Sequence, residues 1–345
     1  MNTKRFISLS ISIAILCYLY SQIKLTELLT VFQTCDPLWM SVSLGMLIPL
    51  TLFTSWRLQQ LMPQGTNITG HTSKGTSPEL GSGVYEPRPC VERRGQPLTF
   101  LEANRLILGS SVLNMILPSK MGDIAKAYFM QERDGLSGTL SLSIVIFEKA
   151  CDMLSLLLWC AFGLILYPQK DSLFWLMTAG IIGGLTLGIL LLSDRRFANL
   201  FFTLTCKFAP KKIALKLQQM QNSWTEMHDY FWGDIKQLTL ITVTSIFIWF
   251  LHLLQIWLFI IALRAWTPFT ASLALSPLSI LAGLLPLTFA GIGTRDAALI
   301  FFYQPYLSEV TGAALGLLCT SRYFLPAIIG LPFLGQMLAT ARARR

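Results

Sequence analysis

The chain has 345 residues, of which 53% are hydrophobic and only 13% are charged. Soluble domains contain about 25% charged residues, so half of the usual solubilising groups are missing. This composition excludes a water-soluble globular enzyme. The formal net charge of +9 does not indicate nucleic-acid binding. The basic residues lie between apolar segments, where positive-inside bias and anionic lipid headgroups favour them.

Apolar runs long enough for a helix to cross a bilayer recur along the chain. They lack the period-two alternation of a transmembrane β-barrel. We therefore predict an all-α polytopic membrane protein with about six full transmembrane helices and two broken, re-entrant hairpins, roughly six to eight spans in all. The apolar runs are Phe6–Tyr20, Leu38–Phe53, Thr139–Leu166, Leu173–Leu192, Leu238–Leu263, Ala271–Ala290 and Ala313–Ala341.

The first apolar run has two interpretations. Lys4 and Arg5 precede it, as basic residues precede the core of a signal peptide. No small-residue cleavage site follows, because the run ends in the bulky Cys17–Tyr20. We favour an uncleaved first span.

Lys and Arg gather in the segments 1–5, 63–99 and 193–236 and at the C-terminus. Positive-inside bias predicts that these segments, including both termini, are cytoplasmic, in a multi-pass protein of the plasma (inner) membrane. The segments 100–138 and 268–306 must then each cross an even number of times. Re-entrant hairpins satisfy this requirement, the first entering from inside and the second from outside.

Leu108–Phe129 and Leu281–Phe302 resemble each other. Each has small residues, a proline, a glycine-rich break, a basic and an acidic residue, and an Ala-rich helix start. Interrupted apolar segments at corresponding positions of two halves indicate a transport site between inverted repeats. The alternative is two ordinary kinked helix pairs with Gly-Pro turns.

We treat residues 1–345 as a single flippase-like membrane domain with two non-membrane segments. Residues 63–99 are rich in Gly, Pro, Ser and Thr and have almost no apolar periodicity, which predicts a disordered cytoplasmic loop insertion. In residues 193–237, apolar side chains recur at helical spacing among basic ones. This pattern predicts amphipathic helices lying on the cytoplasmic membrane face, or alternatively a solvated connector.

Charged residues inside apolar segments are costly and invite functional hypotheses. Glu102 and Arg105 share a helix face at the start of the first hairpin and can pair. Further along, Pro118 and Gly122 break the helix and free backbone N–H groups. A helix start flanked by lysines suits a phosphate or another anion, and the alternative is a capped helix with surface lysines. The residues of this candidate anion site are Asn114, Lys120, Asp123 and Lys126.

Glu148 and Asp152 are the sharpest polar anomaly, because two carboxylates lie one helical turn apart within an apolar span. They must face a polar interior, find cations or hold a proton. Lys149 is expected to point elsewhere. A structural ion network and a substrate or proton site are both consistent with this pattern. The candidate cation partners are Arg105, Lys120 and Lys126.

A second candidate anion site is formed by Arg295 and Asp296, which follow the glycine-rich break, together with Arg322. Guanidinium groups bind phosphate in a bidentate manner. His252 is a lone histidine on an apolar span, which is typical of a helix-packing residue. We therefore predict headgroup contacts from Asn114, Lys120, Asp123, Lys126, Arg295, Asp296 and Arg322, with Glu102, Glu148 and Asp152 as intramembrane carboxylates.

The sequence contains no Walker A motif, HExxH motif, nucleophile elbow or CxxC pair. We expect no catalytic residues, no bound metal and no cofactor, and we do not expect an enzyme. A membrane-embedded enzyme acting through Glu148 and Asp152 is the least favoured alternative.

Three motifs resemble the flippase-like family typified by the transmembrane region of lysylphosphatidylglycerol synthases. Asn114–Ala127 matches N-x-x-LP-x-x-x-GD-x-x-(R/K)-A, and Glu148–Asp152 matches E-(R/K)-x-x-D. Pro286–Ala297 matches P-x-x-x-x-G-x-G-x-R-(E/D)-A. Lys120 stands where arginine is common in the family, and residues 63–99 resemble an insertion. The resemblance spans roughly Phe6–Ala341.

The resemblance implies a membrane domain that moves lipids or lipid-linked groups between leaflets. The expected partners are an anionic phospholipid or a lipid-linked saccharide, and no nucleic acid. Lysyl transferase members carry a soluble domain after the membrane region, and this sequence ends at Arg345, so we do not expect lipid aminoacylation. The alternative function is a non-catalytic membrane partner of a lipid-modifying enzyme or glycosyltransferase.

Overall fold

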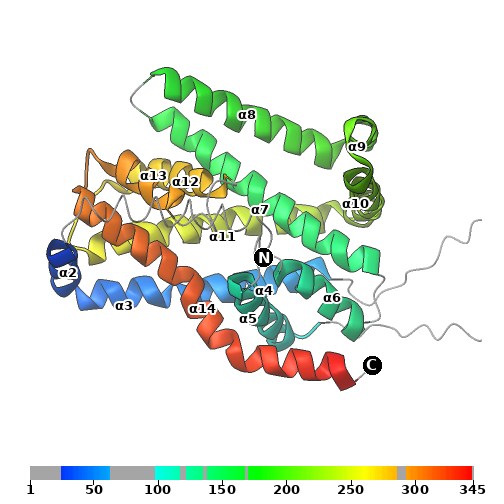
Figure 1. Ribbon diagram of the computed structural model, residues 1–345, viewed down its shortest axis with the longest axis horizontal. Coiled ribbons are helices and arrows are strands. Elements are labelled where there is room, and N and C mark those ends of the chain that lie inside the picture. The colour runs from blue at the N-terminus through cyan, green and yellow to red at the C-terminus, as the bar shows by residue number, and fades with distance from the viewer. Residues whose placement is uncertain are drawn as a thin grey trace, which may run out of the picture.

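The computed structural model describes residues 25–62, 98–116, 122–134, 138–167, 170–285 and 293–343. Within these ranges the secondary structure is helical, with no strand, which confirms the all-α polytopic fold class. The helices (Figure 1) are α2 (Leu25–Gln33), α3 (Pro37–Gly45), α4 (Leu47–Leu61), α5 (Phe100–Ile116), α6 (Gly122–Asp134), α7 (Gly138–Leu166), α8 (Ser172–Ser193), α9 (Arg195–Phe208), α10 (Lys211–Phe231), α11 (Ile235–Ala262), α12 (Phe269–Leu284), α13 (Thr294–Tyr303) and α14 (Glu309–Ala343).

Among the described residues, 5 helical segments are long and apolar enough to cross a membrane. The predicted span Phe6–Tyr20 and the predicted loop up to residue 97 lie outside the described residues. The span predicted as Leu38–Phe53 extends further, because α3 and α4 together run to Leu61. The 5 segments are Pro37–Leu61, Leu140–Leu166, Ser172–Ser193, Ile235–Ala262 and Glu309–Gly335.

The α3–α4 span runs antiparallel to α11, as polar contacts along its whole length show. At one end, Asp36 N donates to Ala262 O at 2.8 Å, and Gln255 Nε2 donates to Ser43 O at 2.9 Å. At the other end, the side-chain amide of Gln237 donates to Gln60 O. Such contacts between apolar helices fix their register, because a slip would leave buried polar groups without partners.

The end of the bundle that holds Gln60 and Gln237 also carries α9 and α10 (Figure 1), and we call it the basic end. Two tryptophans fix α10 there, because Trp224 Nε1 donates to Leu191 O at 3.0 Å and Trp232 Nε1 donates to Leu192 O at 2.9 Å. The basic end owes its charge to exposed side chains: Arg195, Arg196, Lys207 and Lys236.

The segment 193–237 forms helices with apolar side chains on two faces. Ala198 and Phe202 of α9 are buried against the bundle, whereas Leu200, Leu204 and Phe208 are exposed, Phe208 to 83%. An exposed apolar face beside basic residues is typical of a helix lying at a membrane surface. The division of the chain into a membrane domain (1–345), a loop insertion (63–99) and an amphipathic connector (193–237) stays a prediction.

The two predicted hairpins correspond to helix pairs, α5–α6 and α12–α13, whose members pack on each other. In Figure 1, α5 and α6 lie toward the end where α4 finishes, and α12 and α13 lie toward the opposite end, near α2. The breaks at residues 117–121 and 286–292, including Lys120, lie outside the described residues. This arrangement suits hairpins that enter from opposite sides, and the inverted-repeat interpretation stays a prediction.

Two glycines allow helices to approach at backbone distance. A Cβ on Gly330 of α14 would lie 2.2 Å from Leu108 O of α5, and one on Gly163 of α7 would lie 2.4 Å from Ala274 O of α12. Small residues at such crossings are typical of helix packing in membranes. They tie each hairpin to a long span.

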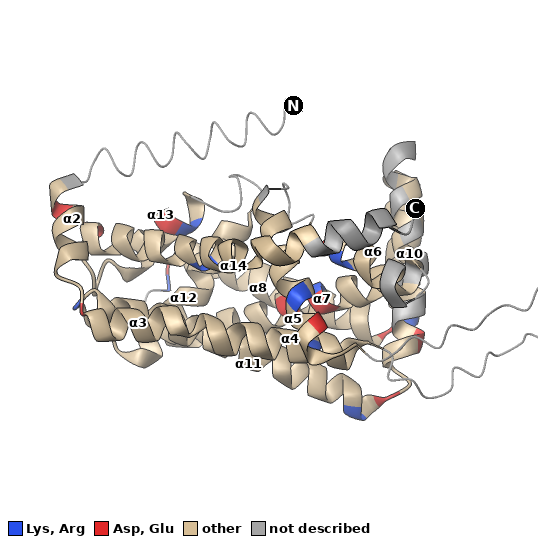
Figure 2. Cartoon of the chain, turned by 90° about the horizontal axis from the view of Figure 1, so that it is seen from below, with Lys and Arg blue, Asp and Glu red and all other residues tan. Residues whose placement is uncertain are grey.

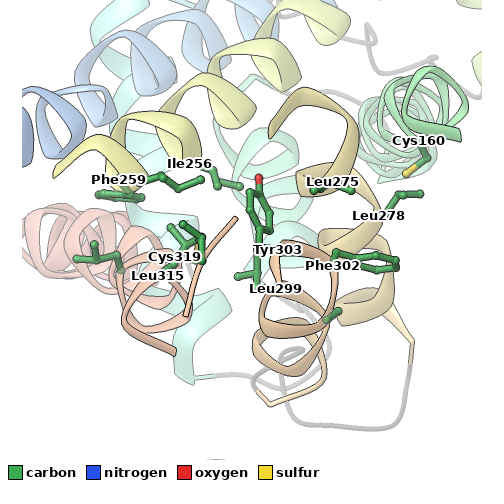
Figure 3. Close-up of a cluster of buried hydrophobic side chains, with 14 of the residues drawn as sticks. Cys160, Ile256, Phe259, Leu275, Leu278, Leu299, Phe302, Tyr303, Leu315 and Cys319 are labelled. Carbon is green, nitrogen blue, oxygen red and sulfur yellow. The ribbon is translucent and has the colours of Figure 1, made fainter. Parts of the chain in front are cut away.

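A large apolar core joins α7, α11, α12, α13 and α14 (Figure 3). The Tyr303 side chain of α13 reaches into this core. Its hydroxyl group lies 2.9 Å from Ser272 Oγ and 2.6 Å from Ser276 Oγ of α12, so this buried hydroxyl group has hydrogen-bond partners. The core therefore holds α13, which carries Arg295 and Asp296, in a fixed position.

Candidate functional site

Arg57 of α4 is the centre of a buried ion network that the sequence analysis missed. Its Nη2 lies 3.0 Å from Glu148 Oε1, and its Nη1 lies 2.6 Å from Asp152 Oδ1. The same Nη1 donates to Ser245 Oγ of α11 at 2.9 Å. The side chain of Arg57 is 2% exposed. One guanidinium group therefore links α4, α7 and α11.

The carboxylates of α7 also meet α6. Lys126 Nζ forms an ion pair and hydrogen bond with Glu148 Oε2, and both side chains are buried. Lys126 is thus the one of the three expected cation partners that the described residues place on a carboxylate of α7. Arg105 instead lies with its guanidinium carbon 6.0 Å from the centre of the Phe333 ring.

Lys149 does not point elsewhere, and this prediction is wrong. Its Nζ lies 3.4 Å from Asp152 Oδ2 and 3.3 Å from Asp123 Oδ2. Asp123 comes from α6, which the sequence alone cannot place beside α7. The Lys149 side chain is 43% exposed, so these long contacts are solvent-screened.

We call these residues the α7 cluster, and its formal charges cancel. Ion pairs removed from water are stable only when each charge is matched and hydrogen-bonded. The charges are matched here, because three cations face three carboxylates, while Arg57 Nε is buried with no hydrogen-bond partner among the described residues. The α7 cluster comprises Arg57, Asp123, Lys126, Glu148, Lys149 and Asp152.

Asn114 joins the α7 cluster through α6. Its Nδ2 lies 3.4 Å from Asp123 Oδ1, while its Oδ1 is buried with no hydrogen-bond partner among the described residues. Gly122 makes this approach possible, because a Cβ there would lie 2.6 Å from Asn114 N. A buried acceptor without a partner costs free energy, so Asn114 Oδ1 suits a ligand that donates a hydrogen bond.

Arg295 and Asp296 form a second, separate pair at the start of α13. Gly293 has φ 97°, a conformation that favours glycine, and its N–H donates to Asp296 Oδ2 at 3.1 Å. Arg295 Nη2 lies 2.8 Å from Asp296 Oδ1 and donates to Thr320 Oγ1 of α14 at 2.6 Å. Asp296 therefore stabilises the N-terminus of α13 and orients the Arg295 side chain.

Arg322 of α14 differs from the other buried or half-buried cations. Its Nη2 is hydrogen-bonded to Nδ1 of His252 on α11. Guanidinium is always protonated, so Nδ1 is the acceptor and the imidazole is neutral in this contact. Within the described ranges, Arg322 has no carboxylate partner. We call Arg322 and His252 the α14 dyad.

A cavity of about 270 Å³ lies between the α7 cluster and the α14 dyad. Both hairpins contribute to its wall, as Arg295 comes from α13 and Asn114 comes from α5. Figure 2 shows long stretches of α3 and α11 without charge, and blue and red segments gathered near α4, α5 and α7. The charged and polar lining residues include Arg57, Asn114, Asp123, Lys126, Glu148, Lys149, Asp152, His252, Arg295 and Arg322.

Two of the predicted site residues lie outside the lining of this cavity. Glu102 accepts hydrogen bonds from Thr99 N, at 3.1 Å, and from the Thr99 hydroxyl group, so it stabilises the start of α5. Asp296 acts behind Arg295. The other described candidates are brought together, although they lie as far apart in sequence as Asn114 and Arg322.

A model of the lysylphosphatidylglycerol synthase TM region matches residues 5–330. The chain belongs to this family. No curated protein matches the chain. The matched residues include the cavity lining, the α7 cluster and the α14 dyad. The family name refers to synthases of a modified phospholipid, so the chain is a multi-pass membrane protein related to lipid modification or transport.

Proposed function

We propose that this protein binds the phosphate group of a lipid headgroup in the central cavity and moves the lipid between the two leaflets. The expected lipids are an anionic phospholipid or a lipid-linked saccharide. The acyl chains would stay in the bilayer, since a cavity of about 270 Å³ is below the usual size of a pocket for a whole drug-sized ligand.

The observation that carries this proposal is the unmatched charge of Arg322. The α7 cluster is neutral and Arg295 is paired with Asp296, so the described residues of the cavity wall keep one positive charge. A phosphodiester carries one negative charge and would neutralise it. A guanidinium group also presents two N–H donors in the geometry of two phosphate oxygens.

The polar groups that Asn114 and the α7 cluster contribute to the cavity support a hydroxylated headgroup. Asn114 Oδ1 is a buried acceptor without a partner in the described part of the chain. The long contacts of Lys149 with Asp123 and Asp152 leave these groups able to exchange partners. Glycerol and sugar hydroxyl groups both donate and accept hydrogen bonds, so they would match this wall.

We further infer that the basic end faces the cytoplasm of a bacterial-type inner membrane, with both termini on that side. The support is the exposed Arg195, Arg196, Lys207 and Lys236 at one end of the bundle and the positive-inside rule. Cysteine labelling at exposed positions of α9, against positions in the α7–α8 turn, tests this orientation.

The test of function is translocation of fluorescent phosphatidylglycerol in liposomes reconstituted with purified protein. Losing a hydrogen-bonded charge costs about 1.5–3 kcal/mol, so Arg322→Gln should slow transport about 10- to 150-fold. Asp123→Asn and Glu148→Gln should also lower it if the α7 wall contacts the headgroup. Arg195→Gln is the control, because Arg195 pairs with Asp229 on the exposed connector.

If Arg322→Gln folds normally and its transport rate equals that of the wild type, the lipid does not pass through this site. No movement of any headgroup in a panel would contradict translocation. It would favour the alternative that the protein assists a lipid-modifying enzyme or glycosyltransferase.

A further inference from the structure

The geometry points to the α14 dyad as a proton-coupled anion site, in which His252 takes up a proton when a phosphodiester binds Arg322. This inference rests on the proposed function and adds its coupling to pH. His252 is not among the predicted headgroup contacts, although it lines the same cavity as Arg322.

In the structure, the imidazole accepts a hydrogen bond from Arg322. Protonation of Nδ1 would place two positive charges in contact and remove the acceptor, so the dyad opposes it. A phosphodiester on Arg322 reverses this situation. Nδ1 then faces a negative oxygen, and a protonated imidazole becomes a second donor to the anion.

Among the described residues around His252, no other group is placed to take this role. Two of the helices that pack on α11, namely α3 and α12, carry no titratable side chain. A third helix, α10, meets α11 at the basic end, where Asp229 pairs with Arg195. From α4, α6 and α7 the cavity receives the α7 cluster, whose carboxylates are matched by its own cations. Around the dyad lie Arg295 from α13, matched by Asp296, and Cys319 and Tyr323 of α14.

The proton balance follows directly. Each bound phosphodiester brings one negative charge and recruits one proton from water to Nδ1, and both leave together when the headgroup departs. Affinity should therefore rise as the pH falls. Over the pH range in which the bound imidazole is protonated and the free one is not, affinity should fall about tenfold per pH unit.

The experiment is isothermal titration calorimetry of the full chain in detergent with dihexanoyl-phosphatidylglycerol, in buffers of different ionisation enthalpy, from pH 5.5 to 7.5. The phosphodiester itself stays singly charged in this range. We expect close to one proton taken up per lipid near the acidic end. Inorganic phosphate in a parallel titration tells a free phosphate site from a lipid site.

His252→Asn is the informative variant, because an amide oxygen can still accept from Arg322 but cannot be protonated. It should bind the lipid with an affinity that does not depend on pH and with no proton uptake. His228→Asn is the matched control: this histidine lies on α10, stacked on Trp232, and the variant should keep both properties of the wild type.

The outcomes separate the two proposals. Lipid binding without proton uptake in the wild type, or uptake retained in His252→Asn, overturns the coupling and leaves the proposed function in place. Absence of lipid binding at every pH overturns both. If His252→Asn does not fold, the proton number of the wild type still decides the coupling.

Discussion

The α7 cluster and the α14 dyad line the same cavity but balance their charges differently. In the α7 cluster each cation lies on at least one carboxylate, and Arg57 and Lys149 each contact two. In the dyad, Arg322 has a neutral imidazole as its hydrogen-bond partner. A balanced network is able to hold helices together, whereas under the proposed function the unbalanced cation attracts a ligand. Charged residues that line one cavity can thus balance their charges in two different ways.

The largest effect should follow removal of Arg57. Arg57→Met leaves Glu148 short of a partner and Asp152 dependent on a half-exposed lysine, and an uncompensated buried charge costs about 3–5 kcal/mol. Unfolding of purified protein by denaturant in detergent measures this loss. A change below about 1 kcal/mol, the range of an exposed ion pair, would show that the α7 cluster is not structural.

Arg322→Lys tests whether the α14 dyad binds lipid or stabilises the fold. Lysine keeps the charge but loses the bidentate geometry, so lipid affinity should fall about 10-fold, while the free energy of unfolding changes by less than about 1 kcal/mol. Calorimetric titration and denaturant unfolding measure the two quantities. Equal losses in affinity and stability would mean that the dyad is a second structural cluster.

The helix crossings near the hairpins should tolerate no added side chain. Gly330→Ala would place a Cβ 2.2 Å from Leu108 O and should destabilise the protein by about 1–3 kcal/mol through overpacking. Gly180→Ala is the control on α8, because nothing lies within 4 Å of its Cβ position. Thermal melting measures the difference. Equal melting temperatures for Gly330→Ala and Gly180→Ala would show that this helix crossing tolerates an added methyl group.

The smallest effect should come from the connector. Arg195 lies 2.7 Å from Asp229, but the two side chains are 49% and 56% exposed. Arg195→Ala should therefore change stability by at most about 1 kcal/mol, and less at high salt. A loss comparable to that of Arg57→Met would show that the connector carries more of the fold than its exposure indicates.

The sequence predicted the spans and the charged candidates better than their partners. Long apolar runs identify helices by length alone, and Glu148 and Asp152 are conspicuous because they interrupt one. Arg57 was missed because it follows the apolar run Leu38–Phe53 by a few residues, where a basic residue is typical of the membrane interface. Only the full length of α3–α4 places it inside the bundle.

The pairings themselves could not be predicted, because each depends on tertiary contacts. Lys149 meets Asp123 only because α6 folds back onto α7, and Gly122 permits the close approach of α6 to α5 that brings Asn114 to Asp123. His252 had the features of a packing residue, and its hydrogen-bond partner in the cavity is Arg322, which lies far from it in sequence.

The most direct test of the account is the contact between lipid phosphorus and the Arg322 guanidinium. Solid-state NMR with ¹⁵N-labelled arginine and phosphatidylglycerol measures it as dephasing of the ³¹P signal of the bound lipid. We predict dephasing in the wild type and in Arg57→Lys, and its loss in Arg322→Lys. Dephasing that survives in Arg322→Lys and disappears in Arg57→Lys would place the phosphate on the α7 cluster and contradict the account.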